Sequence, residues 1–260
     1  MPCPALYASV PSCASFCWLS PLRSGRALLS LTDDREPVEY RNWEIYLASQ
    51  YTESRDGVAF TAPHMEINYG ILPNFQLHVI FPAEYVRPSG GPSHYGYGDM
   101  ELGLKWKFYE NEEGHFLAGI LPLLEVPTGD KGKGLDGEPQ FFMPLWLQKS
   151  WGPWTTYGGG GYWINPGSGN RNYGFVGWEI QREITKQFTL GAEIFHRTPA
   201  EVGGVSDTGF NAGSIVNLTD NHHILFSAGR DISGPDRFSF YIAYQLTFGP
   251  RKEAGAAETH

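Results

Sequence analysis

The sequence predicts an all-β protein, a closed antiparallel up-and-down transmembrane β-barrel of about twelve strands. Three observations predict it: strands with one apolar and one polar face, connections that alternate between long and short, and an aromatic content of 15%. The clearest strand is Asp99–Tyr109, about as long as the ten residues that a tilted strand needs to cross a bilayer. Its residues Met100, Leu102, Leu104, Trp106 and Phe108 share one face, and Asp99, Glu101, Gly103, Lys105 and Lys107 share the other. This period of two is typical of a β-strand.

The same alternation, together with the turn residues, places the other strands along the chain. The predicted strands are Asn42–Thr52, Pro63–Gly70, Phe75–Tyr85, Asp99–Tyr109, His115–Pro127, Gln140–Trp151, Trp154–Asn165, Asn172–Glu183, Phe188–Arg197, Thr208–Leu218, His223–Asp231 and Phe238–Phe248. The fifth, sixth and seventh strands alternate poorly, and the glycine run Gly158–Gly161 carries no facial signal. We expect these glycines to allow tight curvature or close packing of aromatic rings.

The connections between the predicted strands alternate in length. The longer connections are Glu53–Ala62, Arg87–His94, Gly129–Glu138, Pro166–Arg171 and Pro199–Asp207, and the shorter are Leu72–Asn74, Glu110–Gly114, Gly152–Pro153, Ile184–Gln187 and Thr219–Asn221; the last, Ser233–Arg237, is intermediate. Outer-membrane barrels have short periplasmic turns and longer outer loops, and an even strand number places both termini on the periplasmic side. A soluble β-sandwich or jelly roll, the alternative fold, has no reason to sort its loops in this way.

Composition excludes several other classes of protein. No apolar run reaches the roughly 18 residues of a membrane helix, and the net charge of -9 argues against a nucleic-acid partner. The cysteines, Cys3, Cys13 and Cys17, all precede the predicted barrel, which excludes a disulfide scaffold or a cysteine metal site in its body.

The sequence divides into a poorly ordered segment (1–30), the barrel (31–249) and a polar tail (250–260). The first segment lacks the basic start and clean apolar core of a secretory signal. Either the true start lies elsewhere or the chain is not exported; the barrel pattern favours the first reading.

Charged and histidine side chains recur on the polar faces and are expected to line the lumen. The lumen-lining candidates are Glu44, His64, Glu66, His78, Asp99, Glu101, Lys105, Lys107, Glu125, Glu179 and Glu193. Because an isolated buried charge is costly, these groups should pair, as a network that fills and rigidifies the lumen or as a charged path for a solute. The acidic segment Leu31–Tyr40 should lie at the periplasmic mouth and enter the lumen, with Asp33, Asp34 and Glu36 as plug candidates.

The sequence offers weak signals for metal binding and catalysis. His64, Glu66 and His78 could bind zinc or copper, but we expect them to hydrogen-bond one another, and we predict no metal site and no cofactor. Barrel lipases use a His-X-Ser pair, which is absent here, so no catalytic residue is assigned. We therefore predict a protein that is not an enzyme; an outer-membrane enzyme acting on lipid through a cross-strand triad is the alternative.

Tryptophans gather in and around the poorly alternating strands. Because tryptophan favours membrane interfaces, we expect Trp146, Trp151, Trp154, Trp163 and Trp178 to form an outward-facing aromatic belt.

Three segments, Leu31–Asp34, Gly98–Phe108 and Leu124–Asp130, carry a resemblance to a known family. In order and spacing they resemble the outer-membrane β-barrel family named for the MetA pathway of phenol degradation, over roughly Leu31–Gly249. The resemblance implies a bacterial outer-membrane channel or transporter for small apolar or aromatic compounds. Outer-membrane lipid and a small-molecule solute are then the expected partners, and the oligomeric state is left open.

The chain departs from this family at both ends. It lacks the expected signal, and it continues past the terminal aromatic residue Phe248, which barrels usually present at the very end for assembly. A structural barrel with a plugged lumen is a further alternative to a transporter.

Overall fold

The computed structural model describes Thr32 and residues 36–250 of the chain. The expectations for residues 1–30, for Asp33 and Asp34, and for the tail from residue 251 lie outside the described residues. The strands are β1 (Trp43–Ser54), β2 (Gly57–Leu72), β3 (Phe75–Pro88), β4 (His94–Tyr97), β5 (Met100–Asn111), β6 (Phe116–Ile120), β7 (Leu123–Val126), β8 (Gln140–Trp151), β9 (Trp154–Ile164), β10 (Tyr173–Thr185), β11 (Phe188–Arg197), β12 (Asp207–Asn217), β13 (His222–Ser233) and β14 (Phe238–Phe248). A single 3-10 turn, η2 (Lys131–Lys133), accompanies them in this part of the chain, where no helix is long and apolar enough to span a membrane.

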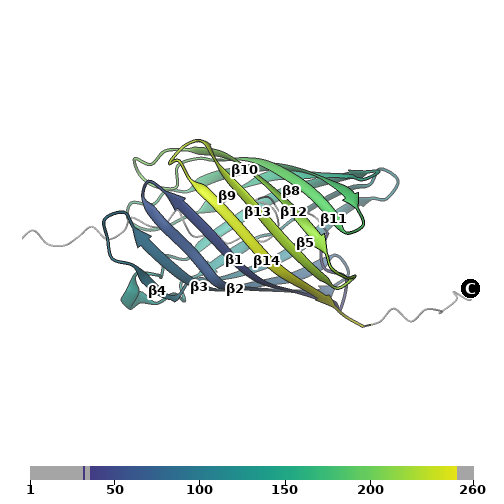
Figure 1. Ribbon diagram of the computed structural model, residues 1–260, viewed down its shortest axis with the longest axis horizontal. Coiled ribbons are helices and arrows are strands. Elements are labelled where there is room, and N and C mark those ends of the chain that lie inside the picture. The colour runs from purple at the N-terminus through teal and green to yellow at the C-terminus, as the bar shows by residue number, and fades with distance from the viewer. Residues whose placement is uncertain (1–31, 33–35, 251–260) are drawn as a thin grey trace, which may run out of the picture.

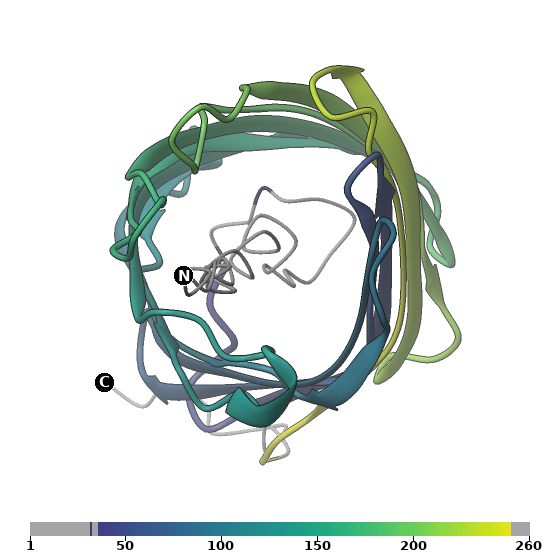
Figure 2. The ribbon, with the colours of Figure 1, turned by 90° about the vertical axis from the view of Figure 1, so that its left-hand side faces the viewer.

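The strands form one closed antiparallel sheet, a barrel with tilted staves (Figure 1; Figure 2). The sheet closes where β1 pairs with β14, from Trp43 opposite Phe248 to Glu53 opposite Phe238. The 14 strands fill twelve positions around the barrel, because β4 with β5, and β6 with β7, each make one interrupted stave. The predicted fold class, an all-β antiparallel barrel of twelve strands, is therefore confirmed.

Side chains alternate between the two faces of the wall, as the sequence pattern predicted. On β5, Leu104, Trp106 and Phe108 are exposed on the outside, while Glu101 and Lys105 are buried inside. Large apolar residues are exposed on the outside of every long stave, whereas the buried groups facing inward are a mixture of polar and aromatic side chains. This is the pattern of a barrel that has lipid rather than water around it.

The two ends of the barrel differ in the length of their connections. Tight turns such as Pro73–Asn74 and Gly152–Pro153 join strands at one end, where Asn74 (φ 67) and Gly152 (φ 54) adopt the left-handed conformation that these turns require. Longer loops join strands at the other end, to the left in Figure 1. One predicted connection is wrong: residues 53–62 are not a long loop, because β1 and β2 continue to a two-residue turn, Arg55–Asp56.

Candidate functional site

The lumen has a polar wall and an aromatic wall, joined by one row of residues paired across the strands. This central row begins with Glu44 on β1 and ends with Tyr173 on β10. In order it contains Glu44, Asn68, His78, Gly103, Leu123, Phe142, Trp163 and Tyr173. Its first members are polar and its last are aromatic, and because the strands are tilted the row climbs from the short-turn end at Glu44 to the long-loop end at Tyr173.

His78 lies at the centre of the polar wall, on β3. Its Nδ1 lies 2.8 Å from Asn68 Oδ1 and its Nε2 lies 3.0 Å from Glu101 Oε1. Glu66 Oε1 is 3.4 Å from Nδ1 and accepts a hydrogen bond from the Asn68 amide at 2.8 Å. Both ring nitrogens therefore face acceptors, an arrangement that a doubly protonated imidazole satisfies between two carboxylates.

The polar wall continues onto β1 and β14 through hydroxyl and amide groups. The buried Tyr46 hydroxyl donates to Glu44 at 2.7 Å and accepts from the Gln245 amide at 2.9 Å. We expected His64 to hydrogen-bond with Glu66 or His78. It is buried, but neither of its ring nitrogens has a hydrogen-bond partner among the described residues. No group of three metal-ligating side chains is found in this part of the chain.

The remaining lumen candidates occupy three different settings. Lys105, Glu125, Glu179 and Glu193 are buried on the inner face. Lys107 lies towards the short-turn end and pairs with Glu110 at 2.5 Å, apart from the His78 cluster. Asp99 lies in the break between β4 and β5 and accepts hydrogen bonds from the amides of Gly129 and Gly137, at 2.9 and 2.7 Å. It therefore anchors the long β7–β8 loop.

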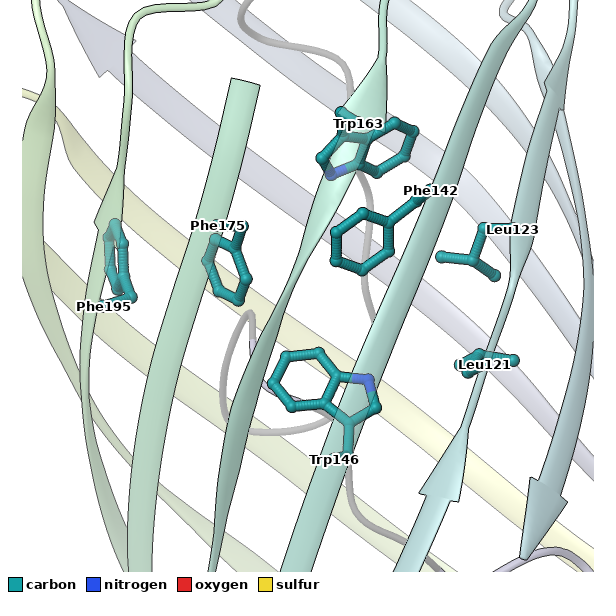
Figure 3. Packing of buried hydrophobic residues seen from close by; sticks show 7 residues of the cluster. All are labelled: Leu121, Leu123, Phe142, Trp146, Trp163, Phe175 and Phe195. Atoms are coloured by element: carbon teal, nitrogen blue, oxygen red, sulfur yellow. The ribbon is translucent and has the colours of Figure 1, made fainter. Parts of the chain in front are cut away.

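The aromatic wall covers the inner face from β7 to β11 (Figure 3). Its buried members are Leu121, Leu123, Phe142, Trp146, Trp163, Phe175 and Phe195. Phe142 stacks on Trp163 with ring centroids 4.8 Å apart, and Trp163 stacks on Tyr173 at 5.8 Å. Phe175 contacts Trp146 edge-on at 6.0 Å and Phe195 at 6.4 Å, so the rings form one contiguous surface.

Glycines make room for these rings. A Cβ on Gly161 would lie 2.7 Å from the Phe142 ring, and one on Gly209 would lie 2.5 Å from the Phe195 ring. On the outer face of β9, a Cβ on Gly158 would lie 2.4 Å from the Trp178 ring. The expectation that the Gly158–Gly161 run allows close aromatic packing is thus confirmed on both faces of β9.

Sequence reasoning missed the aromatic wall and misplaced two of its tryptophans. Trp146 and Trp163 are not part of an outer belt, because they are 0% and 3% exposed and point into the barrel. Trp151 and Trp178 do lie outside, 44% and 48% exposed. The residues 141–147 of β8 are apolar on both faces, so no alternation in the sequence tells the two faces apart.

The segment before β1 crosses the lumen from the short-turn end. Tyr40 bridges to Gly70, and the Val38 amide donates to Gln76 at 2.8 Å on the β2–β3 side. Farther back, Glu36 accepts a hydrogen bond from Gln148 on β8 at 3.1 Å. The buried Thr32 hydroxyl donates to Glu193 on β11, next to the aromatic wall. The described part of this segment therefore touches both walls.

An ion-pair cluster lies at the opposite, long-loop end of the inner face. Asp207 accepts from Arg197 at 2.8 Å and from Arg237 at 2.9 Å, and the Arg197 guanidinium lies 5.8 Å from the centre of the Phe195 ring.

In the neighbouring β11–β12 loop, partial burial raises the pKa of Glu201, and the nearby Asp56 carboxylate adds to this effect.

Comparison with known proteins establishes the fold. No protein family and no curated protein matches the chain. Among solved structures, an outer-membrane channel from Pseudomonas putida F1 has a TM-score of 0.66 at 16% identity, covering 83% of this chain and 98% of that one. A KdgM porin in complex with disordered oligogalacturonate has a TM-score of 0.57 at 13% identity, covering 79% and 99%. The translocator domain of the autotransporter NalP from Neisseria meningitidis has a TM-score of 0.55 at 10% identity, covering 80% and 90%.

The chain thus has the fold shared by these outer-membrane channels, porins and translocators.

Proposed function

We propose that the chain is a channel of the bacterial outer membrane that passes small apolar or aromatic compounds. The aromatic wall is the observation that carries this proposal. A barrel that only needed to fill its interior could pair polar groups throughout, whereas seven buried apolar side chains cover one side of this barrel's inner face. Such a surface favours flat apolar solutes by burial and ring stacking. The resemblance to the MetA-pathway family supports the same solute class.

Three features support the membrane location. The outer face carries large apolar side chains, aromatic residues such as Trp43 and Trp106 lie near the short-turn rim, and the connections are long at one end only. We infer that the short turns face the periplasm and that outer-membrane lipid surrounds the staves.

A channel whose lumen is closed by its own N-terminal segment is the second candidate, favoured by the contacts of Thr32 and Glu36 with the far wall. A lipid-modifying enzyme finds less support. The histidine rings of the described residues hydrogen-bond to Asn68, Glu101, Thr208, Asn217 and Tyr244, and none to a serine.

Quenching of tryptophan fluorescence by bromobenzene tests the proposed solute class. The reconstituted barrel should show a saturable component of quenching from the two lumen tryptophans, Trp146 and Trp163. That component should disappear in a Trp146→Phe/Trp163→Phe variant and persist in the control Trp178→Phe, whose indole faces outward. Quenching without saturation, identical in all three proteins, would show partition into lipid alone and would contradict the proposal.

A further inference from the structure

Two exposed cations lie on the outside of the barrel near the short-turn rim, Lys149 on β8 and Arg182 on β10. Neither forms an ion pair with another described residue. The Arg182 guanidinium lies 5.1 Å from the centre of the Trp154 ring, which holds it against the wall. Lysine and arginine at the edge of an apolar band reach the interface with their charged ends, where the phosphates of lipid headgroups lie.

The strand register places these cations on the two strands that flank β9, at the edge of an apolar surface. Lys149 lies opposite Thr156, and Arg182 lies opposite Trp154, on neighbouring rows of the outer face. The next rows hold Leu147, Gly158 and Trp178, then Leu145, Gly160 and Val176. Gly160 therefore leaves the middle of this surface without a side chain, between two exposed apolar residues.

Thr156 fixes the aromatic part of this surface. Its hydroxyl donates to the Glu179 carbonyl at 2.7 Å and accepts from Trp178 Nε1 at 2.8 Å. The Trp178 ring is thereby held over Gly158. Tryptophan and arginine at the interface, next to an apolar strip, match the two parts of a phospholipid, a phosphate and an acyl chain.

We propose that Lys149 and Arg182 bind the phosphate group of an anionic phospholipid, whose acyl chain lies over Gly160. The proposal rests on the membrane location proposed above, with the short turns on the phospholipid side of the membrane. Lysine and arginine near a membrane surface each strengthen attraction to anionic lipid severalfold. Trp154 and Trp178 limit the motion of the headgroup and of the first part of the chain.

Native mass spectrometry with phosphatidylglycerol as the probe tests this site. A Lys149→Gln/Arg182→Gln variant should bind phosphatidylglycerol about thirtyfold more weakly than the unaltered protein, since each cation contributes about 1 kcal/mol. A matched control, Arg55→Gln/Arg230→Gln, removes two cations at the long-loop end that already contact Asp236, and should keep the original affinity. Phosphatidylcholine, whose phosphate is neutralised by its own choline, should show little difference. Equal affinity of all three proteins for phosphatidylglycerol would overturn the proposal.

Heat-modifiable gel migration after reconstitution separates this proposal from the proposed function. If the unaltered protein does not insert as a closed barrel, the membrane location fails and the lipid site fails with it. If it inserts and binds phosphatidylglycerol without regard to Lys149 and Arg182, only the lipid site is overturned. If the double variant does not insert, the single variants Lys149→Gln and Arg182→Gln test the lipid site instead. Each should bind phosphatidylglycerol severalfold more weakly than the unaltered protein.

Discussion

His78 and Leu123 meet above Gly103, the residue of β5 that separates the polar wall of the lumen from the aromatic wall. A Cβ on Gly103 would lie 2.7 Å from Leu123 Cδ2 and 3.2 Å from His78 Cβ. The absence of a side chain at this position lets an imidazole that faces two carboxylates lie next to an apolar surface. The polar wall and the aromatic wall therefore meet at this point of the lumen.

Replacing His78 with alanine should lower the free energy of unfolding by about 3–5 kcal/mol, because Glu66 and Glu101 lose the cation between them. Urea unfolding of the reconstituted barrel measures this change. Adding Glu66→Gln and Glu101→Gln to the His78→Ala variant should recover most of the loss. If the triple variant is no more stable than His78→Ala, the loss does not come from the carboxylates.

A methyl group on Gly209 should destabilise the barrel by about 1–3 kcal/mol, because the Phe195 ring, which packs on Phe175, would have to shift away from it. The added Cβ would lie 2.5 Å from the ring and 3.1 Å from the Arg230 carbonyl oxygen. Gly174→Ala is the matched control, since the nearest atom to its Cβ would be 3.9 Å away. Equal unfolding midpoints for the two variants would show that Phe195 does not pack on Gly209.

The outward face of β5 should contact lipid. Leu104→Arg should lower the free energy of unfolding by roughly 2–4 kcal/mol if Leu104 lies near the bilayer midplane. Tyr97→Arg, at a position 78% exposed on β4, should have little effect. A spin label at Leu104 that reports an aqueous environment would contradict the assignment of this face.

Deleting the residues before Arg41 should raise single-channel conductance in planar bilayers. The deletion removes the contacts of Thr32 with Glu193 and of Glu36 with Gln148, which take the chain across the lumen. Heat-modifiable migration should be unchanged, because β1 and its pairing with β14 remain. An unchanged conductance would mean that loops or packed side chains of the wall form the barrier.

The sequence was most informative where only one face of a strand is apolar. On β5 and β14 the alternation predicted both the strand and its outward-facing side, because most of the inward residues are polar or small. The start of β2 was missed since the register shifts between Thr61 and His64, so the alternation on the two sides of this irregularity does not match.

The aromatic wall could not be predicted for a related reason. On β8 the outward-facing and the inward-facing residues are both apolar. The sequence of this strand therefore shows no alternation of apolar and polar residues. Trp146 and Trp163 were assigned to the wrong face of the barrel wall. The preference of tryptophan for membrane interfaces does not determine whether the side chain faces outward or into the lumen. The polar wall was easier to anticipate, since His78 and Glu101 alternate with apolar residues that could only face outward.

The most direct test of the aromatic wall as a solute path is the rate at which an apolar naphthylamine dye enters intact cells that produce the protein. Cells with the unaltered barrel, or with the control Tyr97→Asn outside the lumen, should take up the dye faster than cells without it. A Phe142→Asn/Phe175→Asn variant, present in the outer membrane in equal amount, should return the rate close to that of cells without the barrel. Uptake through this variant at the unaltered rate would contradict the account.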